Sequence, residues 1–264
     1  MGENHKLYVP THPGQVGAKR LKDYVVPLED GSGGMQPALL VGNLLEKNMA
    51  PIIGGGLNQD YATSLTVPGW TVTTGGTGDA TANATTGGLL ATLASDDNFD
   101  MTLDSVLAVT PTTGKWYHLA ARMQVSDATG IGFKIGLTTG GSAAALPFGT
   151  NYTDVVAFSK PIASAAMVGT CRGNSGTAAD TATLATVVAA TEIEIGFAFY
   201  CHATAAQGYW VVNDTVTGMS AAQLAQINAL LTTPQTMYWT IHGTGVTATN
   251  PTMTITSFIA GGDK

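Results

Sequence analysis

Residues 116–126 read Trp-Tyr-His-Leu-Ala-Ala-Arg-Met-Gln-Val-Ser, and every second position is apolar or aromatic. This period of two is that of a β-strand with one buried face. The face consists of Tyr117, Leu119, Ala121, Met123 and Val125. Residues 131–138 repeat the alternation, with Ile131, Phe133, Ile135 and Leu137 on one face and Gly132, Lys134, Gly136 and Thr138 on the other. These segments predict two successive β-strands.

Further short segments of strand character follow on both sides, separated by turns rich in Gly, Asn, Asp and Pro. We expect strands at 70–73, 89–93, 99–103, 154–159, 166–171, 192–202, 209–212, 237–242 and 252–259. Asn213-Asp214 is expected to form a hairpin turn, and Gly75–Gly88 a low-complexity loop. Eight to eleven strands of this kind predict an all-β antiparallel sandwich or jelly roll.

One helix is expected, from Ala221 to Leu231. Ser220 and Gln223 have the spacing of a capping box, in which each side chain bonds the backbone of the other residue. Leu224, Ile227 and Leu231 then form one apolar stripe.

The 264-residue chain has only 11% charged residues and a net charge of −7. Its 11 Lys and Arg residues are too few for the clustered positive charge that binds a phosphate backbone, so no nucleic-acid partner is expected. No apolar run approaches 18 residues and no apolar leader is evident, so neither a membrane partner nor secretion is expected. Cys171 and Cys201 are expected to be buried free thiols, although a disulfide between them stays open.

The first 50 residues differ from the rest, because they hold ten charged residues of balanced sign and no periodic apolar pattern. Such a segment cannot close a core of its own. We therefore expect residues 1–60 to form an extended N-terminal arm ending in a Gly-rich hinge, and residues 61–264 to form the sandwich domain. The candidate anchors by which this arm binds a partner are Tyr24, Val25, Val26, Leu39, Leu40 and Val41.

Glu192 and Glu194 are the first candidates for catalysis, since carboxylates at positions i and i+2 share one face of a strand. Glycosidases on lectin-like sandwiches need a third alternating acid, which is absent here. A solvated pair at the start of a strand is therefore the favoured interpretation. Because no triad or phosphate loop is present either, we expect no enzyme, no catalytic residue and no cofactor.

The sequence contains two candidate metal sites, and neither is expected to bind a metal. Cys171, Cys201, His202 and His242 lack the spacing of zinc ligands, and adjacent strand residues point to opposite faces. Residues 96–98 (Asp-Asp-Asn) with Asp100 suit calcium in chemistry but lack a complete calcium-loop pattern, so a polar turn is favoured. The four tryptophans, Trp70, Trp116, Trp210 and Trp239, are expected to pack in the core or at the end of the barrel rather than on a sugar-binding platform.

The stretch Lys115–Asp127, followed by Gly132-Phe-Lys-Ile-Gly-Leu137, resembles the concanavalin-type jelly-roll proteins of tailed-bacteriophage head gene clusters. The order of later segments agrees with this resemblance, namely Val156-Ala-Phe158, Ile193–Phe199, Tyr209–Asp214 and Met253–Ile259. The resemblance covers about residues 66–262. One departure is Asp214-Thr215 in place of Asp-Gly, which suggests a longer turn.

The resemblance implies a structural virion protein: a capsid decoration, or cement, protein on the outer surface of the head. It implies the major capsid protein as partner, self-association as a homotrimer, and assembly in the host cytoplasm. The alternative is a carbohydrate-binding, lectin-like module of a phage spike or fibre. The sparse charge of the body agrees with a surface that docks at little desolvation cost.

Overall fold

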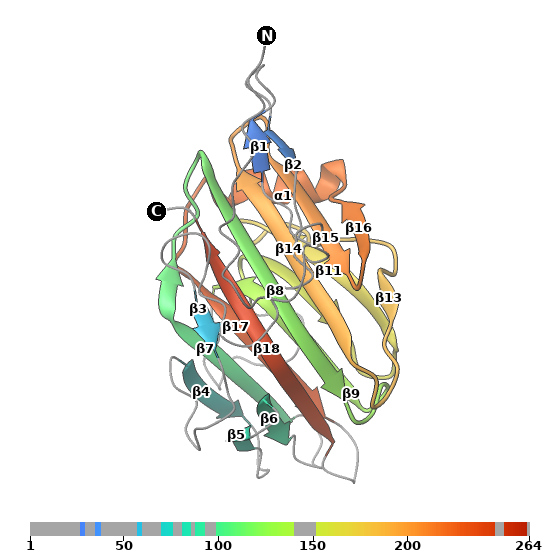
Figure 1. Cartoon of the computed structure of the whole chain (residues 1–264). Coiled ribbons are helices and arrows are strands. Elements are labelled where there is room, and N and C mark those ends of the chain that lie inside the picture. Colours follow the sequence, from blue (N-terminus) through green and yellow to red (C-terminus); the bar gives the residue numbers. More distant parts are fainter. Residues whose placement is uncertain are drawn as a thin grey trace, which may run out of the picture.

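A computed structural model describes residues 27–29, 35–37, 57–59, 70–75, 81–85, 88–92, 99–139, 152–245 and 251–262. Side chains are described for 108–139, 152–245 and 251–262, except at 257 and 259. In these ranges the chain forms two eight-stranded antiparallel sheets that pack face to face, with one helix (Figure 1). This architecture confirms the predicted all-β sandwich. The six candidate arm anchors lie outside the described residues.

The front sheet in Figure 1 has β8 and β14 at its centre. Its strand order is β16 (Thr215–Gly218), β15 (Gln207–Val212), β14 (Ile193–Cys201), β8 (Lys115–Val125), β18 (Thr252–Gly262), β6 (Gly88–Thr92) and β5 (Thr81–Thr85), with β3 (Leu57–Gln59) also paired to β18. Strand β3 falls in the segment assigned to the arm.

The back sheet is built around β9 and β17. Its order is β12 (Ala179–Asp180), β11 (Ala166–Arg172), β10 (Val155–Lys160), β9 (Ile131–Thr138), β17 (Met237–Gly245), β7 (Phe99–Val109) and β4 (Trp70–Gly75), with β13 (Ala185–Thr186) also paired to β11. Two further strands, β1 (Pro27–Glu29) and β2 (Met35–Pro37), pair with each other.

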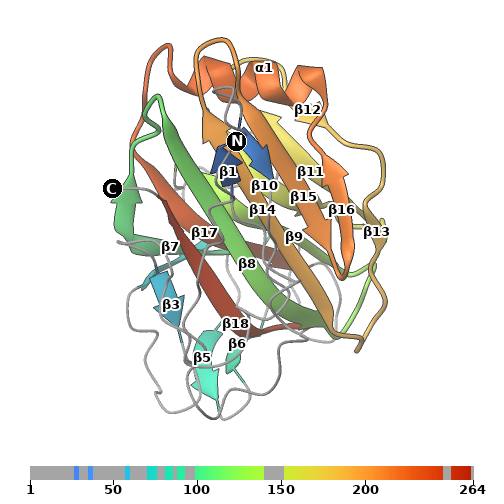
Figure 2. The same cartoon turned by 45° about the horizontal axis from the view of Figure 1, so that its top comes forward.

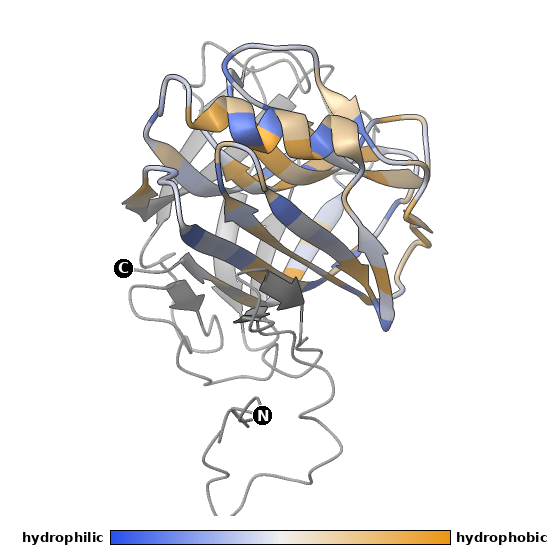
Figure 3. Cartoon of the chain, turned by 90° about the horizontal axis from the view of Figure 1, so that it is seen from above, coloured by the Kyte–Doolittle hydropathy of each residue, from blue (hydrophilic) through white to orange (hydrophobic). Residues whose placement is uncertain are grey.

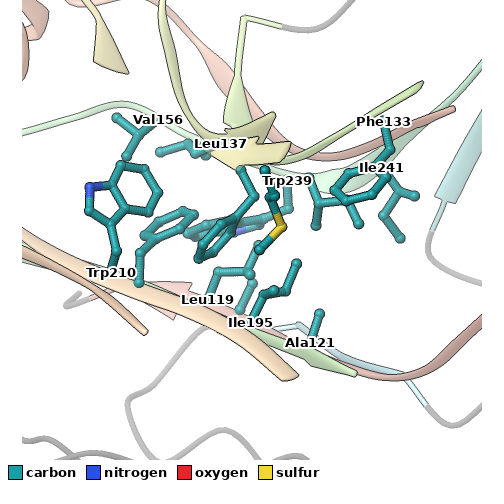
Figure 4. Close-up of a cluster of buried hydrophobic side chains, with 14 of the residues drawn as sticks. Leu119, Ala121, Phe133, Leu137, Val156, Ile195, Trp210, Trp239 and Ile241 are labelled. Atoms are coloured by element: carbon teal, nitrogen blue, oxygen red, sulfur yellow. The ribbon is translucent and has the colours of Figure 1, made fainter. Parts of the chain in front are cut away.

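The core lies between the sheets and is made of the faces that the alternation predicted (Figure 4). Phe197 and Trp210 of the front sheet meet Phe158 and Trp239 of the back sheet. The rings of Phe158 and Trp210 are 5.0 Å apart at 72°, and those of Phe197 and Trp210 are 5.5 Å apart at 70°. Such edge-to-face contacts are favourable for aromatic rings. All four side chains are buried, so they fix how the two sheets pack.

Helix α1 (Ala221–Leu230) lies across one end of the sandwich (Figures 2 and 3) and packs against β11 and β12. The predicted capping box is present, since the Ser220 hydroxyl accepts the Gln223 N–H and the Gln223 side chain accepts the Ser220 N–H. The fully buried residues are Gln223, Ile227 and Leu230, while Leu224 and Leu231 pack at the margin of the core. In the described residues, no helix has the length and apolarity to cross a membrane.

Three local predictions are wrong. The described residues contain eighteen strands rather than eight to eleven, because several are only two to four residues long. The expected loop Gly75–Gly88 contains β5, which pairs with β6. The hairpin after β15 has two turn residues instead of a longer turn, because Val212 pairs directly with Thr215. Asn213 takes the left-handed conformation with φ 50°, which asparagine tolerates, so the hairpin closes without glycine at this position.

Candidate functional site

The acidic pair at the start of β14 is held by an arginine of the neighbouring strand. Arg122 on β8 lies directly opposite Glu194 in the sheet register and forms an ion pair with it. The Nε of Arg122 is 3.3 Å from a carboxylate oxygen of Glu192, whose other oxygen accepts the Thr256 hydroxyl at 3.3 Å. Glu192 is about half exposed, so the pair is only partly solvated. The carboxylates thus form one ion-pair network rather than an isolated solvated pair.

Sequence reasoning did not place Arg122 in this site. A signal was present, because Arg122 is on the polar side of the alternation in residues 116–126. Its partner lies 72 residues away in the chain, and only the register of β8 against β14 brings the two together. One guanidinium therefore contacts both carboxylates of the pair.

Aromatic side chains occupy the opposite end of the same outer face, defined as the side of the front sheet that faces away from the core. The ring of Tyr200 lies 5.3 Å from that of Trp116 and 6.0 Å from that of His202, with which it is stacked at 16°. Tyr209, on β15, lies diagonal to Tyr200 and is opposite Ala198. Both tyrosines are half-buried, whereas Trp116 is only 4% exposed. Each tyrosine is therefore partly exposed on this face.

Small residues separate the aromatic end from the charged end. Along β14 the outward positions between Tyr200 and Glu194 are Ala198 and Gly196. In the register Gly196 lies between Ala120 of β8 and Val211 of β15, and Ala198 lies between His118 of β8 and Tyr209 of β15. Asn213, in the hairpin turn, accepts the Glu194 N–H through Oδ1 at 3.1 Å. The outer face of the front sheet thus carries two tyrosines, small residues along the middle of β14, and a cluster of charged and amide groups.

The outer face of the back sheet is polar but buried. Its buried side chains are Lys134, Thr138, Ser159, Thr170, Thr240, His242 and Thr244. The Tyr152 hydroxyl lies 3.0 Å from His242 Nδ1, and the hydroxyls of Thr138 and Thr240 are 2.7 Å apart. Burial lowers the pKa of Lys134 to about 8, and its ammonium lies 5.4 Å from the Tyr152 ring. Because these groups are buried, they are not accessible to a ligand at the surface.

The structure does not bring the candidate zinc ligands together. Cys171 is on β11 of the back sheet and Cys201 is on β14 of the front sheet, and both are free and buried as expected. His202 is half-buried, and its Nδ1 accepts the Ala205 N–H at 3.1 Å. In the described part of the chain, no three His, Cys, Asp or Glu residues are grouped to hold a metal. Of the calcium candidates, residues 96–98 lie outside the described residues, and Asp100 is in β7.

The tryptophans have different locations. Trp210 and Trp239 are fully buried in the core, which confirms the expectation for these two and excludes them as a surface sugar platform. Trp116 is also buried, but on the outer face of the front sheet, where its ring is next to that of Tyr200. The contact between these two aromatic residues was not predicted from the sequence, because they are more than 80 residues apart in the chain. The Trp70 side chain lies outside the description.

No protein-family model and no curated protein sequence matches the chain. Solved structures do match, beginning with an endo-1,3-β-glucanase from Streptomyces sioyaensis at a TM-score of 0.54 and 14% identity, covering 82% of this chain and 100% of the glucanase. Lectin II from Ulex europaeus matches at 0.54 and 12%, covering 81% and 100%. The Emp47p carbohydrate recognition domain matches at 0.51 and 10%, covering 80% and 96%. These likenesses show a concanavalin-like fold, which lectins and glucanases share.

Proposed function

We propose that this chain is a non-catalytic carbohydrate-binding domain, and that its ligand lies on the outer face of the front sheet. The observation that carries the proposal is the pair of half-buried tyrosines, Tyr200 and Tyr209, on the same face as Arg122, Glu192 and Glu194. The apolar face of a sugar ring packs on an aromatic ring. Its hydroxyl groups bond carboxylates, guanidinium groups and amides, which are the groups at the charged end.

The arrangement suits an extended ligand. Between Tyr200 and Glu194 the outward residues of β14 are the small Ala198 and Gly196, so a chain of sugars that follows this strand meets no long side chain from it, while His118 and Tyr209 flank it on the neighbouring strands. Among solved structures of the same fold, some are named as lectins or carbohydrate recognition domains. This likeness supports the proposal only by fold, because the identities are 10–14%.

The test is binding to polysaccharides by affinity electrophoresis, using laminarin, soluble galactomannan and hydroxyethyl cellulose as probes. The substitution Tyr209→Ala is expected to weaken binding about tenfold, since packing of a sugar ring on one aromatic ring contributes about 1–1.5 kcal/mol to the binding free energy. Tyr238→Ala is the matched control, because Tyr238 is a half-buried tyrosine of the back sheet. Absence of any retardation of the wild-type chain, or equal effects of the two variants, would contradict the proposal.

The absence of catalysis has its own test. Glycosidase activity on laminarin is expected to be undetectable in the wild-type chain, and Arg122→Met is not expected to create it. The reason is that both carboxylates contact one guanidinium and no third acid follows them on β14. If the wild-type chain released reducing sugar and Glu194→Gln did not, the chain would instead be an enzyme.

A second candidate is the capsid decoration protein implied by the sequence resemblance. The observation that favours it is the sparse charge of the body, where residues 51–264 hold all of the net −7 but only 19 charged residues. A weakly charged surface docks on a shell at little desolvation cost. Cosedimentation with expanded phage heads tests this role, and deletion of residues 1–60 is expected to abolish it if the arm supplies the anchors. Lack of cosedimentation by the full chain would reject this candidate.

A further inference from the structure

Strand β16 forms an open edge of the front sheet. All four of its residues, Thr215–Gly218, are exposed, and within the described chain it pairs on one side only, with β15. Sheet edges in soluble proteins are usually protected by charges, prolines or bulges, because unpaired backbone groups recruit another strand. Strand β16 is short, at four residues, but it carries no charge, proline or bulge: its sequence is Thr-Val-Thr-Gly and its ladder with β15 is regular.

An apolar surface accompanies the open edge. Val216 is 51% exposed and Val188 is 56% exposed, and these are the two large hydrophobic side chains exposed in the described part of the chain. Val188 follows β13 by two residues. Strands β13 and β16 lie on the same flank of the sandwich in both views (Figures 1 and 2). The free edge and the exposed valines are therefore features of one flank.

The backbone N–H and C=O groups of Val216 point toward the free edge, in the plane of the sheet. The two-residue turn makes Val212 and Thr215 the closing pair of the hairpin, and such a pair is hydrogen-bonded. Hydrogen-bonded and non-hydrogen-bonded pairs alternate along an antiparallel ladder. Val216 is thus in a non-hydrogen-bonded pair with Val211, and its own N–H and C=O face away from β15, toward a further strand.

We propose that this edge binds a second copy of the chain, with the two β16 strands antiparallel about a two-fold axis at Val216. The sequence is self-complementary in this arrangement, because Thr215-Val216-Thr217 reads the same in both directions. Val216 is opposite Val216 of the second copy, each Thr215 is opposite a Thr217, and each Asp214 is opposite a Gly218. Apolar and threonine cross-strand pairs are stabilising, and no like charges meet.

This pairing joins the two front sheets into one continuous sheet with their outer faces on the same side. A register shifted by one residue would place the outer face of one copy beside the inner face of the other. The four-residue edge buries a small area, so the dimer is expected to dissociate in the micromolar range rather than to be obligate. The proposal is independent of carbohydrate binding, but two coplanar binding faces would give avidity for a polymeric ligand.

Sedimentation equilibrium of the full chain tests the proposal, and a monomer–dimer equilibrium is expected. Val216→Lys places two like charges opposite each other and is expected to weaken dimerisation at least tenfold, as is Val216→Glu. A 1:1 mixture of these two variants is expected to dimerise again, because the two-fold register pairs position 216 with itself. Gln235→Lys, at an exposed position, is the control for added charge.

Unfolding of each variant is followed by circular dichroism, so that loss of dimer is separated from loss of fold. A wild-type chain that stays monomeric to millimolar concentration would overturn the proposal. So would a trimer, or a dimer that Val216→Lys leaves intact. If the mixed variants failed to associate, the two-fold register at Val216 would be wrong.

Discussion

The side-chain oxygen of Gln223 lies 3.4 Å from the indole Nε1 of Trp210, so a buried glutamine of the helix is bonded to the front sheet. The same oxygen accepts the Ser220 N–H at 3.0 Å, and Nε2 donates to the carbonyl of Gly169 on the back sheet at 2.8 Å. One amide therefore connects the start of α1 with both sheets. Such a buried group is stabilising only while all its partners are satisfied.

Gln223→Met keeps the size of the side chain but leaves the buried Trp210 N–H without this partner, whereas the Gly169 carbonyl still accepts the Thr181 N–H. We expect the free energy of unfolding to fall by about 1–3 kcal/mol, which is the cost of a buried polar group that loses its partner. Urea unfolding followed by tryptophan fluorescence measures the change. Gln235→Met, at an exposed position, is the control and is expected to stay within about 0.5 kcal/mol. Equal stability of the two variants would contradict the role of Gln223.

Gly169 is a glycine because of Trp210. A Cβ at residue 169 would lie 2.4 Å from the Cε2 atom of the Trp210 ring, which is shorter than any van der Waals contact. Gly169→Ala is expected to lower the free energy of unfolding by about 2–3 kcal/mol through overpacking. Gly218→Ala is the matched control, because no atom lies within 4 Å of its added Cβ. If both substitutions had the same effect, the tight contact would not be the cause.

The two thiols are expected to be inert in the native protein. Burial raises the pKa of Cys201 to about 12 and that of Cys171 further, so the reactive thiolate is scarce at neutral pH. Ellman's reagent is expected to modify no cysteine within minutes in buffer and two in 6 M guanidinium chloride. A count of zero in denaturant would indicate the disulfide, and rapid native reaction of either thiol would contradict its burial.

The core was predictable because its pattern is local. The alternation of residues 117–125 and 131–137 predicted which side chains are buried, and Ser220 with Gln223 predicted the start of α1. Strand β5 was missed because Thr-Ala-Asn-Ala-Thr contains no large apolar residue, so its pairing with β6 decides its conformation.

The candidate site was less predictable, because it depends on register between distant strands. The sequence indicated Glu192 and Glu194 as site residues but not Arg122, because Arg122 is opposite Glu194 only once β8 and β14 pair. The half-buried Tyr200 and Tyr209 are likewise diagonal neighbours only because β14 pairs with β15 in this register. A single sequence specifies which face a residue takes in its strand, but not which residue of another strand is beside it.

Two buried lysines are expected to make stability increase with pH above neutrality. Desolvation lowers the pKa of Lys134 and of Lys160 to about 8, against 10.5 for an unperturbed lysine. Above pH 8 the unfolded chain therefore binds more protons than the folded chain, so the free energy of unfolding rises with pH. The thiols oppose this trend above pH 9, because their pKa values are raised from 9.0 in the fold. Urea unfolding between pH 7 and 9 is expected to show this rise in the free energy of unfolding. The double variant Lys134→Met/Lys160→Met is expected to show a flatter pH profile. A wild-type profile that falls across this range would contradict the desolvation of the two ammonium groups.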